Sequence, residues 1–211
     1  MATQYSLVLR NRSTRGGHFC IYATPVDSKV QNDLRSLAWI TYPANVGVEV
    51  DFSWDLNYSF SWSKTGVLSN GVIYRASESL STDPNDPQLA KAYLDKNEYG
   101  YQLISGQPPD KDPAKGGMAI IASDSIPNDD VSIGMGIDGK PILAVMATPR
   151  YIFTFFPDIK YWVAFGNFKK GEVLDLNSMS PIQELVFPTN VYALDVTLDD
   201  VNQWHVQTLN E

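Results

Sequence analysis

The stretch VGVEVDFSWDLNYSFSW, residues 46–62, alternates strictly between apolar side chains at even positions and small or polar side chains at odd positions. A period of two places alternate residues on opposite faces of a β-strand, whereas a helix would scatter the same aromatics around its cylinder. Strands usually run about 3–10 residues. The stretch therefore predicts either one bent strand that serves two sheets or two strands joined near residues 55–57. Its polar positions are expected to face water, among them Glu49, Asp51, Asp55 and Asn57.

Short apolar segments bounded by Gly, Pro, Asn and Asp recur on both sides of this stretch. Such spacing favours an all-β fold, and we expect a two-sheet antiparallel sandwich of Greek-key or jelly-roll type. The expected strands are residues 6–10, 19–23, 67–76, 89–94, 99–104, 118–122, 131–137, 142–148, 151–155, 161–165, 171–176, 184–187, 191–198 and 203–208. Helical spacing of Val30, Leu34 and Leu37, with Ser28 as a cap, predicts one short helix over residues 28–39.

The chain has 211 residues, 44% of them hydrophobic, which suits a single domain over residues 1–211. Residues 105–117 combine Pro, Gly and charged side chains and are expected to form an exposed, flexible loop. No apolar run is long enough to predict a transmembrane segment. The first residues lack a classical signal peptide. We expect cytoplasmic synthesis, with non-classical export left open.

The net charge is −8, with 16 Lys and Arg against 24 Asp and Glu. Nucleic-acid binding requires a basic surface, so this charge argues against nucleic acid as a partner, and equally against docking on anionic lipid. Cys20 is the single cysteine, which excludes an intrachain disulfide and a thiolate zinc cluster. Its neighbours Phe19 and Ile21 indicate a buried structural thiol.

The sequence motifs that could indicate catalysis or a cofactor are weak. Residues 134–139, GMGIDG, match a dinucleotide fingerprint, but Lys140-Pro141 and a β-branched run follow where a helix should begin. We interpret these glycines as parts of a strand and its turn. His18 and His205 lie outside any recognisable nucleophile or zinc motif. We therefore predict no catalytic residue and no cofactor.

Loop carboxylates leave two weaker alternatives open. Calcium prefers several oxygen ligands from loops, and a possible calcium site involves Asp83, Asp86, Asp129 and Asp130. None of these acids has the spacing of a calcium-binding loop, and solvated surface acids are the commoner explanation. Paired acids of a hydrolase would meet only in the folded chain.

Aromatic residues are abundant, with 5 Trp, 11 Tyr and 9 Phe. Alternation assigns those of residues 46–62 to the core. In residues 151–162 aromatics fall on both faces, so some must point outward or be covered by another element or subunit. We predict an interface there, at Tyr151, Phe153, Phe155, Phe156, Tyr161 and Trp162.

Several sequence blocks, in the same order along nearly the whole chain, resemble the rhizosphere-induced RhiA family of bacterial proteins. The blocks include residues 5–11 (YSLVLRN), 58–66 (YSFSWSKTG), 160–166 (KYWVAFG), 186–192 (VFPTNVY) and 202–207 (NQWHVQ). The resemblance implies an association with life around plant roots and with cell-density regulation. The family has no defined biochemical activity, so it supplies no site residues.

These observations favour a non-catalytic interaction protein that acts by binding or by self-association, with a second copy or another protein as its partner. The abundance of strand edges supports this interpretation, because unprotected edges invite pairing. The alternatives are a lectin-like or membrane-active sandwich, with a glycan as possible partner, and a hydrolase that uses loop carboxylates.

Overall fold

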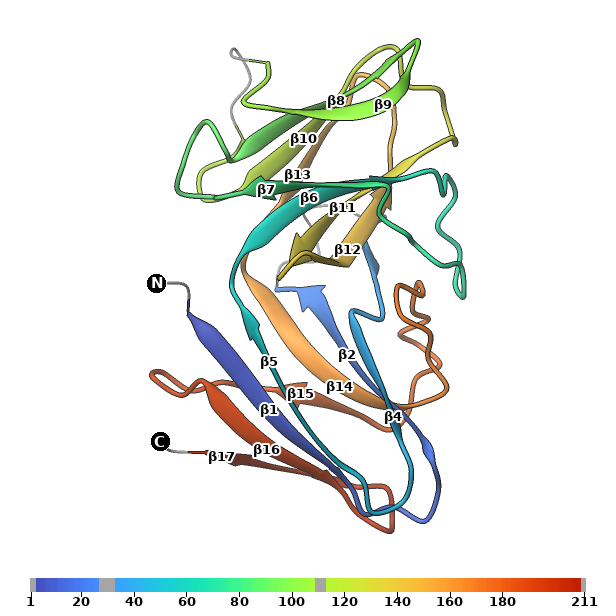
Figure 1. The fold of residues 1–211 in the computed structure, drawn as a ribbon, viewed down its shortest axis with the longest axis vertical. Coiled ribbons are helices and arrows are strands. Elements are labelled where there is room, and N and C mark those ends of the chain that lie inside the picture. The colour runs from blue at the N-terminus through green and yellow to red at the C-terminus, as the bar shows by residue number, and fades with distance from the viewer. Residues whose placement is uncertain (1–2, 27–32, 109–112, 210–211) are drawn as a thin grey trace.

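The computed structural model describes residues 3–26, 33–108 and 113–209, which form seventeen strands and no helix (Figure 1). The predicted all-β class is confirmed. The expected two-sheet arrangement is wrong, because the strands fall into four small sheets. We number these sheets I to IV. Sheets I and II occupy the lower half of Figure 1, sheet III lies above them and sheet IV is at the top.

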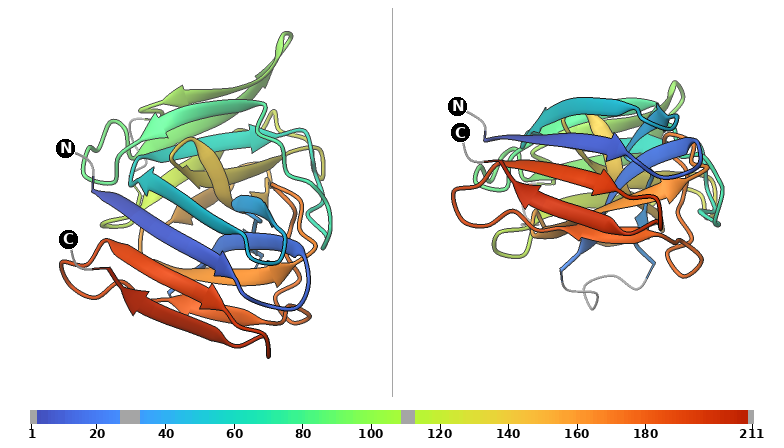
Figure 2. Two further views of the ribbon diagram at one scale, coloured as in Figure 1. Left: turned by 60° about the horizontal axis from the view of Figure 1, so that its bottom comes forward. Right: turned by 90° about the horizontal axis from the view of Figure 1, so that it is seen from below.

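Sheets I and II each contain four strands. The order in sheet I is β17 (Trp204–Thr208), β16 (Ala193–Leu198), β1 (Gln4–Asn11) and β5 (Glu49–Asp55). The order in sheet II is β15 (Ile182–Leu185), β14 (Ile159–Gly166), β2 (Gly17–Pro25) and β4 (Ile40–Ala44). Figure 2 shows the strands of sheet I side by side, with β1 between β5 and β16.

Sheets III and IV form the other half of the molecule. The order in sheet III is β3 (Arg35–Ser36), β12 (Lys140–Met146), β11 (Ser132–Ile137), β6 (Tyr58–Ser63) and β7 (Glu78–Thr82). The order in sheet IV is β13 (Ile152–Phe155), β10 (Met118–Ala122), β8 (Lys91–Asn97) and β9 (Gly100–Ser105). Two strand pairs are parallel, β1 with β16 and β8 with β10, so the expectation of a purely antiparallel fold is wrong.

The alternating stretch forms two strands in two sheets, β5 in sheet I and β6 in sheet III. This confirms the second of the two predicted arrangements. The chain bends between them at Leu56-Asn57, where the Asn57 amide donates to the Asp55 carbonyl at 2.8 Å. Trp54 and Phe60 lie in the core, as the alternation predicts.

The polar face of the stretch behaves differently in its two strands. On β5, Glu49 and Asp51 are exposed as expected. On β6, the odd positions Ser59, Ser61 and Ser63 are buried, so the expectation of a wet face is wrong there. These serines are buried because another part of the chain covers the outer face of sheet III.

That cover consists of three irregular segments, residues 36–39, 67–76 and 170–174, which we call the covering layer. Residues 67–76 and 171–176 are not the strands that their composition predicts. They make only isolated bridges, Leu37 with Val173 and Ile73 with Glu172. The layer forms a small hydrophobic cluster with sheet III, comprising Leu37, Leu68, Tyr74, Ala144 and Val173.

The predicted helix over residues 28–39 is wrong in its described part. Residues 33–39 hold a turn, the short strand β3 and the bridge at Leu37, and residues 27–32 lie outside the described residues. Leu37 belongs to the covering-layer cluster and Trp39 to the main core. The long-range contacts of these side chains therefore override their helical spacing.

The glycine-rich motif at residues 134–139 forms a strand and a turn. Residues 134–137 belong to β11, and the two-residue turn Asp138-Gly139 leads into β12 with φ of 51° and 68°. This confirms that the glycine-rich motif is a strand and its hairpin turn.

Strands β4 and β7 were not predicted from the sequence. Of the predicted loop at 105–117, residues 109–112 lie outside the described residues. No helix in the described part of the chain could span a bilayer.

Candidate functional site

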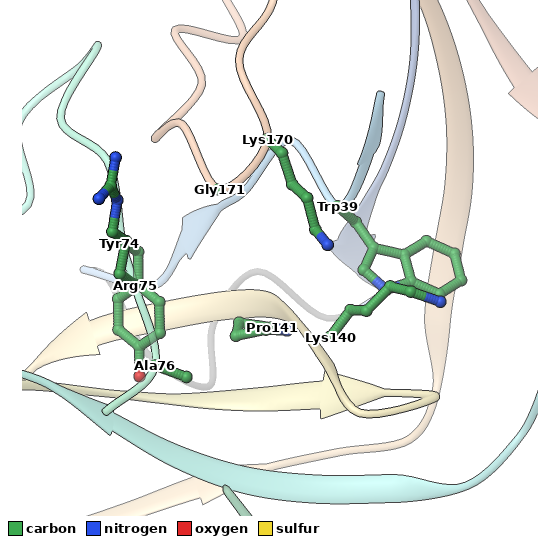
Figure 3. A pocket seen from close by; sticks show the side chains of 8 residues that line it. All are labelled: Trp39, Tyr74, Arg75, Ala76, Lys140, Pro141, Lys170 and Gly171. Carbon is green, nitrogen blue, oxygen red and sulfur yellow. The ribbon is translucent and has the colours of Figure 1, made fainter. Parts of the chain in front are cut away.

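A pocket with a volume of about 260 Å³ opens where the covering layer meets the hairpin of β11 and β12 (Figure 3). Three cationic side chains and two aromatic rings share its lining. The lining residues are Trp39, Tyr74, Arg75, Ala76, Lys140, Pro141, Lys170 and Gly171.

The two aromatic walls are held rigidly. Trp39 is 1% exposed, and its indole Nε1 donates to the Ile137 carbonyl at 3.2 Å. The Tyr74 hydroxyl shares a hydrogen bond of 2.9 Å with Ser61 Oγ, and burial raises the pKa of Tyr74. Tyr74 is therefore neutral at physiological pH, and both walls are fixed before any ligand arrives.

Small residues in sheet III let Tyr74 lie close to the strands. A Cβ atom added to Gly134 would lie 3.3 Å from the Tyr74 hydroxyl oxygen and 2.6 Å from the Leu143 carbonyl oxygen. Ser61 and Ala144 also lie close to this ring or to Gly134. The alternation of serines in β6 and the glycines of β11 thus fix the position of a pocket wall.

Gly171 sets the opposite margin of the pocket. Its φ is 78°, and a Cβ atom added to it would lie 2.5 Å from the Tyr74 carbonyl oxygen. The Tyr74 amide in turn donates to the Gly171 carbonyl at 2.8 Å. Only glycine combines this left-handed backbone with so close an approach of two backbone segments. The neighbouring Lys170 is thereby placed at the pocket mouth.

The three cations differ in how far they are compensated. Lys140 Nζ lies 2.7 Å from Asp138 Oδ2. Lys170 and Arg75 are exposed and have no ion-pair partner among the described residues. In Figure 3 the Lys170 ammonium extends into the space between Tyr74 and Trp39, whereas the Arg75 side chain points away from that space. Among the described residues no carboxylate lines the pocket, so its described lining is locally positive on an acidic protein.

Apolar walls with a cation at the mouth suit a particular kind of ligand. Pockets for small molecules are mostly apolar, with a few polar groups that fix the orientation of the ligand. A carboxylate or similar anion could pair with Lys170 while its apolar body contacts Trp39, Tyr74 and Pro141. The arrangement can bind a small organic anion.

The residues of the predicted interface lie elsewhere, and three of the six are buried within the chain. Phe153, Phe155 and Tyr161 belong to the main core. Trp162 is half-buried, stacks on Tyr22 and donates from Nε1 to Thr24 Oγ1 at 3.0 Å. Phe156 is also half-buried. Tyr151 is 54% exposed and lies just before strand β13, so the predicted interface now depends on this end of the segment.

The acids of the possible calcium site serve local structure. Asp83 Oδ1 accepts from the Asn85 amide and Asp86 Oδ1 from the Gln88 amide, each at 2.8 Å. Asp130 accepts from the Tyr101 hydroxyl, which lowers the pKa of this carboxyl group. Asp129 has a φ of 59° in a turn. Across the described ranges, no three His, Cys, Asp or Glu side chains gather in a way that could hold a metal ion.

The remaining reactive side chains also lie outside the pocket. Nε2 of His205 lies 2.8 Å from Oδ2 of Asp199 on the exposed hairpin of β16 and β17. His18 stands in β2 opposite Pro43 and Gly166. Cys20 is fully buried, and burial raises the pKa of its thiol, which makes it a structural residue.

Sequence reasoning missed the pocket residues entirely. Trp39 fell within the predicted helix, and Tyr74, Arg75, Lys170 and Gly171 fell within or beside predicted strands. The available signal was the sequence Lys169-Lys170-Gly171, a pair of cations before a glycine in an acidic chain.

Comparison with known proteins places this chain in a family. The family model of RhiA matches residues 2–209. The chain is 33% identical over 207 residues to Protein RhiA of Rhizobium leguminosarum bv. viciae, and the match covers 97% of this chain and 86% of that protein. No solved structure matches the chain. The chain belongs to the RhiA family.

Proposed function

We propose that this protein acts by binding, without catalysis, and that it binds a small organic anion in the pocket of Trp39, Tyr74 and Lys170. The observation that carries the proposal is the Lys170 ammonium, which has no ion-pair partner among the described residues and extends into an apolar pocket of a chain whose net charge is −8. An anion placed there gains a charge-assisted hydrogen bond that the protein itself does not supply.

The size of the pocket supports a small ligand. Its volume of about 260 Å³ is near the lower end of the ~300–1,000 Å³ that is usual for ligand sites. A single-ring carboxylate is therefore a better candidate than a sugar chain or a peptide. Its ring would contact Pro141 and the indole of Trp39, and its carboxylate would lie at Lys170.

The same lining supports binding over catalysis. General acid–base chemistry needs a group whose pKa lies near the working pH. The Tyr74 hydroxyl is held by Ser61, and its pKa is raised by burial. The described lining contains no carboxylate, so it does not supply the pair of acids that a hydrolase would require.

Isothermal titration with benzoate and with its neutral isostere benzamide tests the proposal. We expect benzoate to bind and benzamide to bind at least tenfold more weakly, because only benzoate pairs with Lys170. The Lys170→Gln variant should lose about tenfold in benzoate affinity, which corresponds to about 1.4 kcal/mol.

Lys115→Gln is the matched control, because Lys115 is an exposed lysine that does not line the pocket. This variant has the same net charge as Lys170→Gln and should bind benzoate like the parent protein. Equal affinities for benzoate and benzamide, or equal losses in the two variants, would refute the proposal.

A further inference from the structure

The edges of the sheets offer a second place for binding, independent of the pocket. Each of the four sheets is open, so each has two edge strands. An edge strand presents unpaired backbone groups, and proteins protect such edges with charges, prolines or coverage. Most edges here carry such a protection: Glu49 and Asp51 on β5, Arg35 on β3, Glu78 on β7, Glu184 on β15 and Pro43 on β4.

Two further edges are polar or partly covered. On β9, the amide of Leu103 donates to Glu78 Oε2 at 3.1 Å, so a side chain of the neighbouring β7 lies against this edge. On β17, the exposed side chains are the polar His205, Gln207 and Thr208. The contact with Glu78 thus protects part of the β9 edge, and polar side chains protect β17.

Within the described part of the chain, strand β13 has none of these protections, neither a charge or proline nor a side chain bonded against its free edge. Its sequence, Ile-Phe-Thr-Phe, contains no charged residue and no proline. Phe153 and Phe155 anchor it in the core, while Ile152 is 39% exposed. The segment thus combines high β-propensity with an unprotected edge.

The register shows which backbone groups of β13 are free. In the pair of β10 with β13, the Ala122 amide donates to the Tyr151 carbonyl at 2.9 Å, and Ile120 stands opposite Phe153. Hydrogen-bonded pairs alternate with non-hydrogen-bonded pairs in an antiparallel ladder. Phe153 therefore bonds to β10, and the backbone groups of Ile152 and Thr154 point to the free side of the sheet.

An apolar row on one face of sheet IV, the face opposite to that of Phe153, ends at this edge. Ile152 stands opposite Ile121, Ile121 opposite Tyr93 and Tyr93 opposite Ile104. Ile121, in the middle of the row, is buried, whereas Ile152 and Ile104 at its two ends are 39% and 37% exposed. The row crosses all four strands and reaches the free edge of β13.

We propose that β13 pairs antiparallel with β13 of a second copy of this chain, about a two-fold axis at Phe153. Ile152 of each copy then stands opposite Thr154 of the other, and the free backbone groups of both strands are satisfied. A two-fold interface requires a self-complementary patch. Two chains that each carry a net charge of −8 repel one another, and an edge without acidic residues is where they can approach.

The oligomeric state in solution tests this pairing. Light scattering behind size-exclusion chromatography should give twice the chain mass of 23.5 kDa. Ile152→Lys places a charge on the edge and should return the protein to the mass of one chain. Ile182→Lys is the matched control, because Ile182 is equally exposed at 39% and lies on the edge strand β15. This control should remain a dimer.

Cross-linking tests the register. Hydrogen-bonded antiparallel pairs place Cα atoms about 5.5 Å apart, which is within disulfide reach. A mixture of Ile152→Cys and Thr154→Cys chains should oxidise to a mixed dimer more than either variant does alone, and the native Cys20 is fully buried. A parent protein with the mass of one chain would overturn the proposal. A mass of two chains for the Ile152→Lys variant would also overturn it. So would folded cysteine variants that do not cross-link when they are mixed.

Discussion

The indole of Trp39, a wall of the pocket, packs edge-on against the indole of Trp54, with ring centroids 5.3 Å apart and ring planes at 86°. Trp54 in turn stacks on Tyr5 at 5.7 Å and packs against Tyr161 at 5.5 Å. These residues belong to β5, β1 and β14, so the pocket wall is anchored in the aromatic cluster that joins sheets I and II.

Replacing Trp54 should therefore affect both the fold and the pocket. We expect Trp54→Ala to lower the free energy of unfolding by about 3–5 kcal/mol, the usual cost of deleting a buried large aromatic. Trp54→Phe should cost less and should weaken benzoate binding several-fold, because Trp39 loses its packing partner. Urea unfolding and calorimetric titration measure the two effects. Unchanged affinity in a folded Trp54→Phe protein would show that Trp39 does not depend on this contact.

Gly171 and Gly71 both have a left-handed backbone, so a comparison of the two separates the cost of backbone strain from the effect of a close contact. Gly171 has a φ of 78° and Gly71 a φ of 83°. A Cβ atom added to Gly71 would meet nothing within 4 Å, whereas one added to Gly171 would meet the Tyr74 carbonyl oxygen. Gly71→Ala should cost about 1 kcal/mol of stability through its backbone alone. Gly171→Ala should cost more and should abolish benzoate binding. Equal effects of the two variants on binding would contradict the role assigned to Gly171.

The ion pair of Lys140 with Asp138 should limit the affinity of the pocket. Asp138→Asn removes the counter-charge and suits the left-handed backbone at this position, whose φ is 51°. Benzoate affinity should rise two- to fivefold with little change in stability, because exposed ion pairs contribute about 0–1 kcal/mol. Asp124→Asn, which breaks the exposed pair with Arg150, is the control and should leave affinity unchanged. A fall in affinity on Asp138→Asn would refute the electrostatic argument.

Alkaline pH should destabilise the protein through its buried tyrosines. Burial, with a smaller effect of the Cys20 thiol, raises the pKa of Tyr22 to about 12, whereas an unfolded tyrosine ionises near pH ~10. The unfolded chain loses its proton first, so stability is full below about pH 10 and falls as the pH rises toward 12. Urea unfolding from pH 8 to 11.5 should show this loss.

The Tyr22→Phe variant should reduce the slope of stability against pH above about pH 10. Tyr99→Phe, which removes a tyrosine that is 90% exposed, controls for the loss of one phenol group. Slopes that are identical in the parent and in Tyr22→Phe would contradict the assignment.

The parts of the fold that sequence patterns predicted are those whose side chains follow one simple period. The alternation of residues 46–62 predicted one bent strand or two strands, and a core position for Trp54, because each of the two strands has one face on the main core. The Asp138-Gly139 turn could be predicted from the sequence because its left-handed backbone favours these residue types. Periodicity gives no information about which strands pair, so four sheets and two parallel pairs could not be deduced.

The pocket was unpredictable for a related reason. Its wall residues Trp39 and Tyr74 lie in the covering layer, where apolar side chains pack on sheet III without regular backbone structure. The apolar composition of these segments is typical of a strand or a helix, and only contacts between distant segments give them an irregular backbone. The distance from Gly171 to the Tyr74 carbonyl and the direction of Lys170 are properties of the folded chain.

The most direct test of the central claim, that the pocket binds a small organic anion, is a nitrogen–proton NMR titration of the five tryptophan indole groups with benzoate. We predict a saturable shift of the Trp39 indole signal, with the signal of Trp204 on strand β17 unchanged and no comparable effect of benzamide. A Trp39 signal that does not move, or that moves equally with benzamide, would contradict the account.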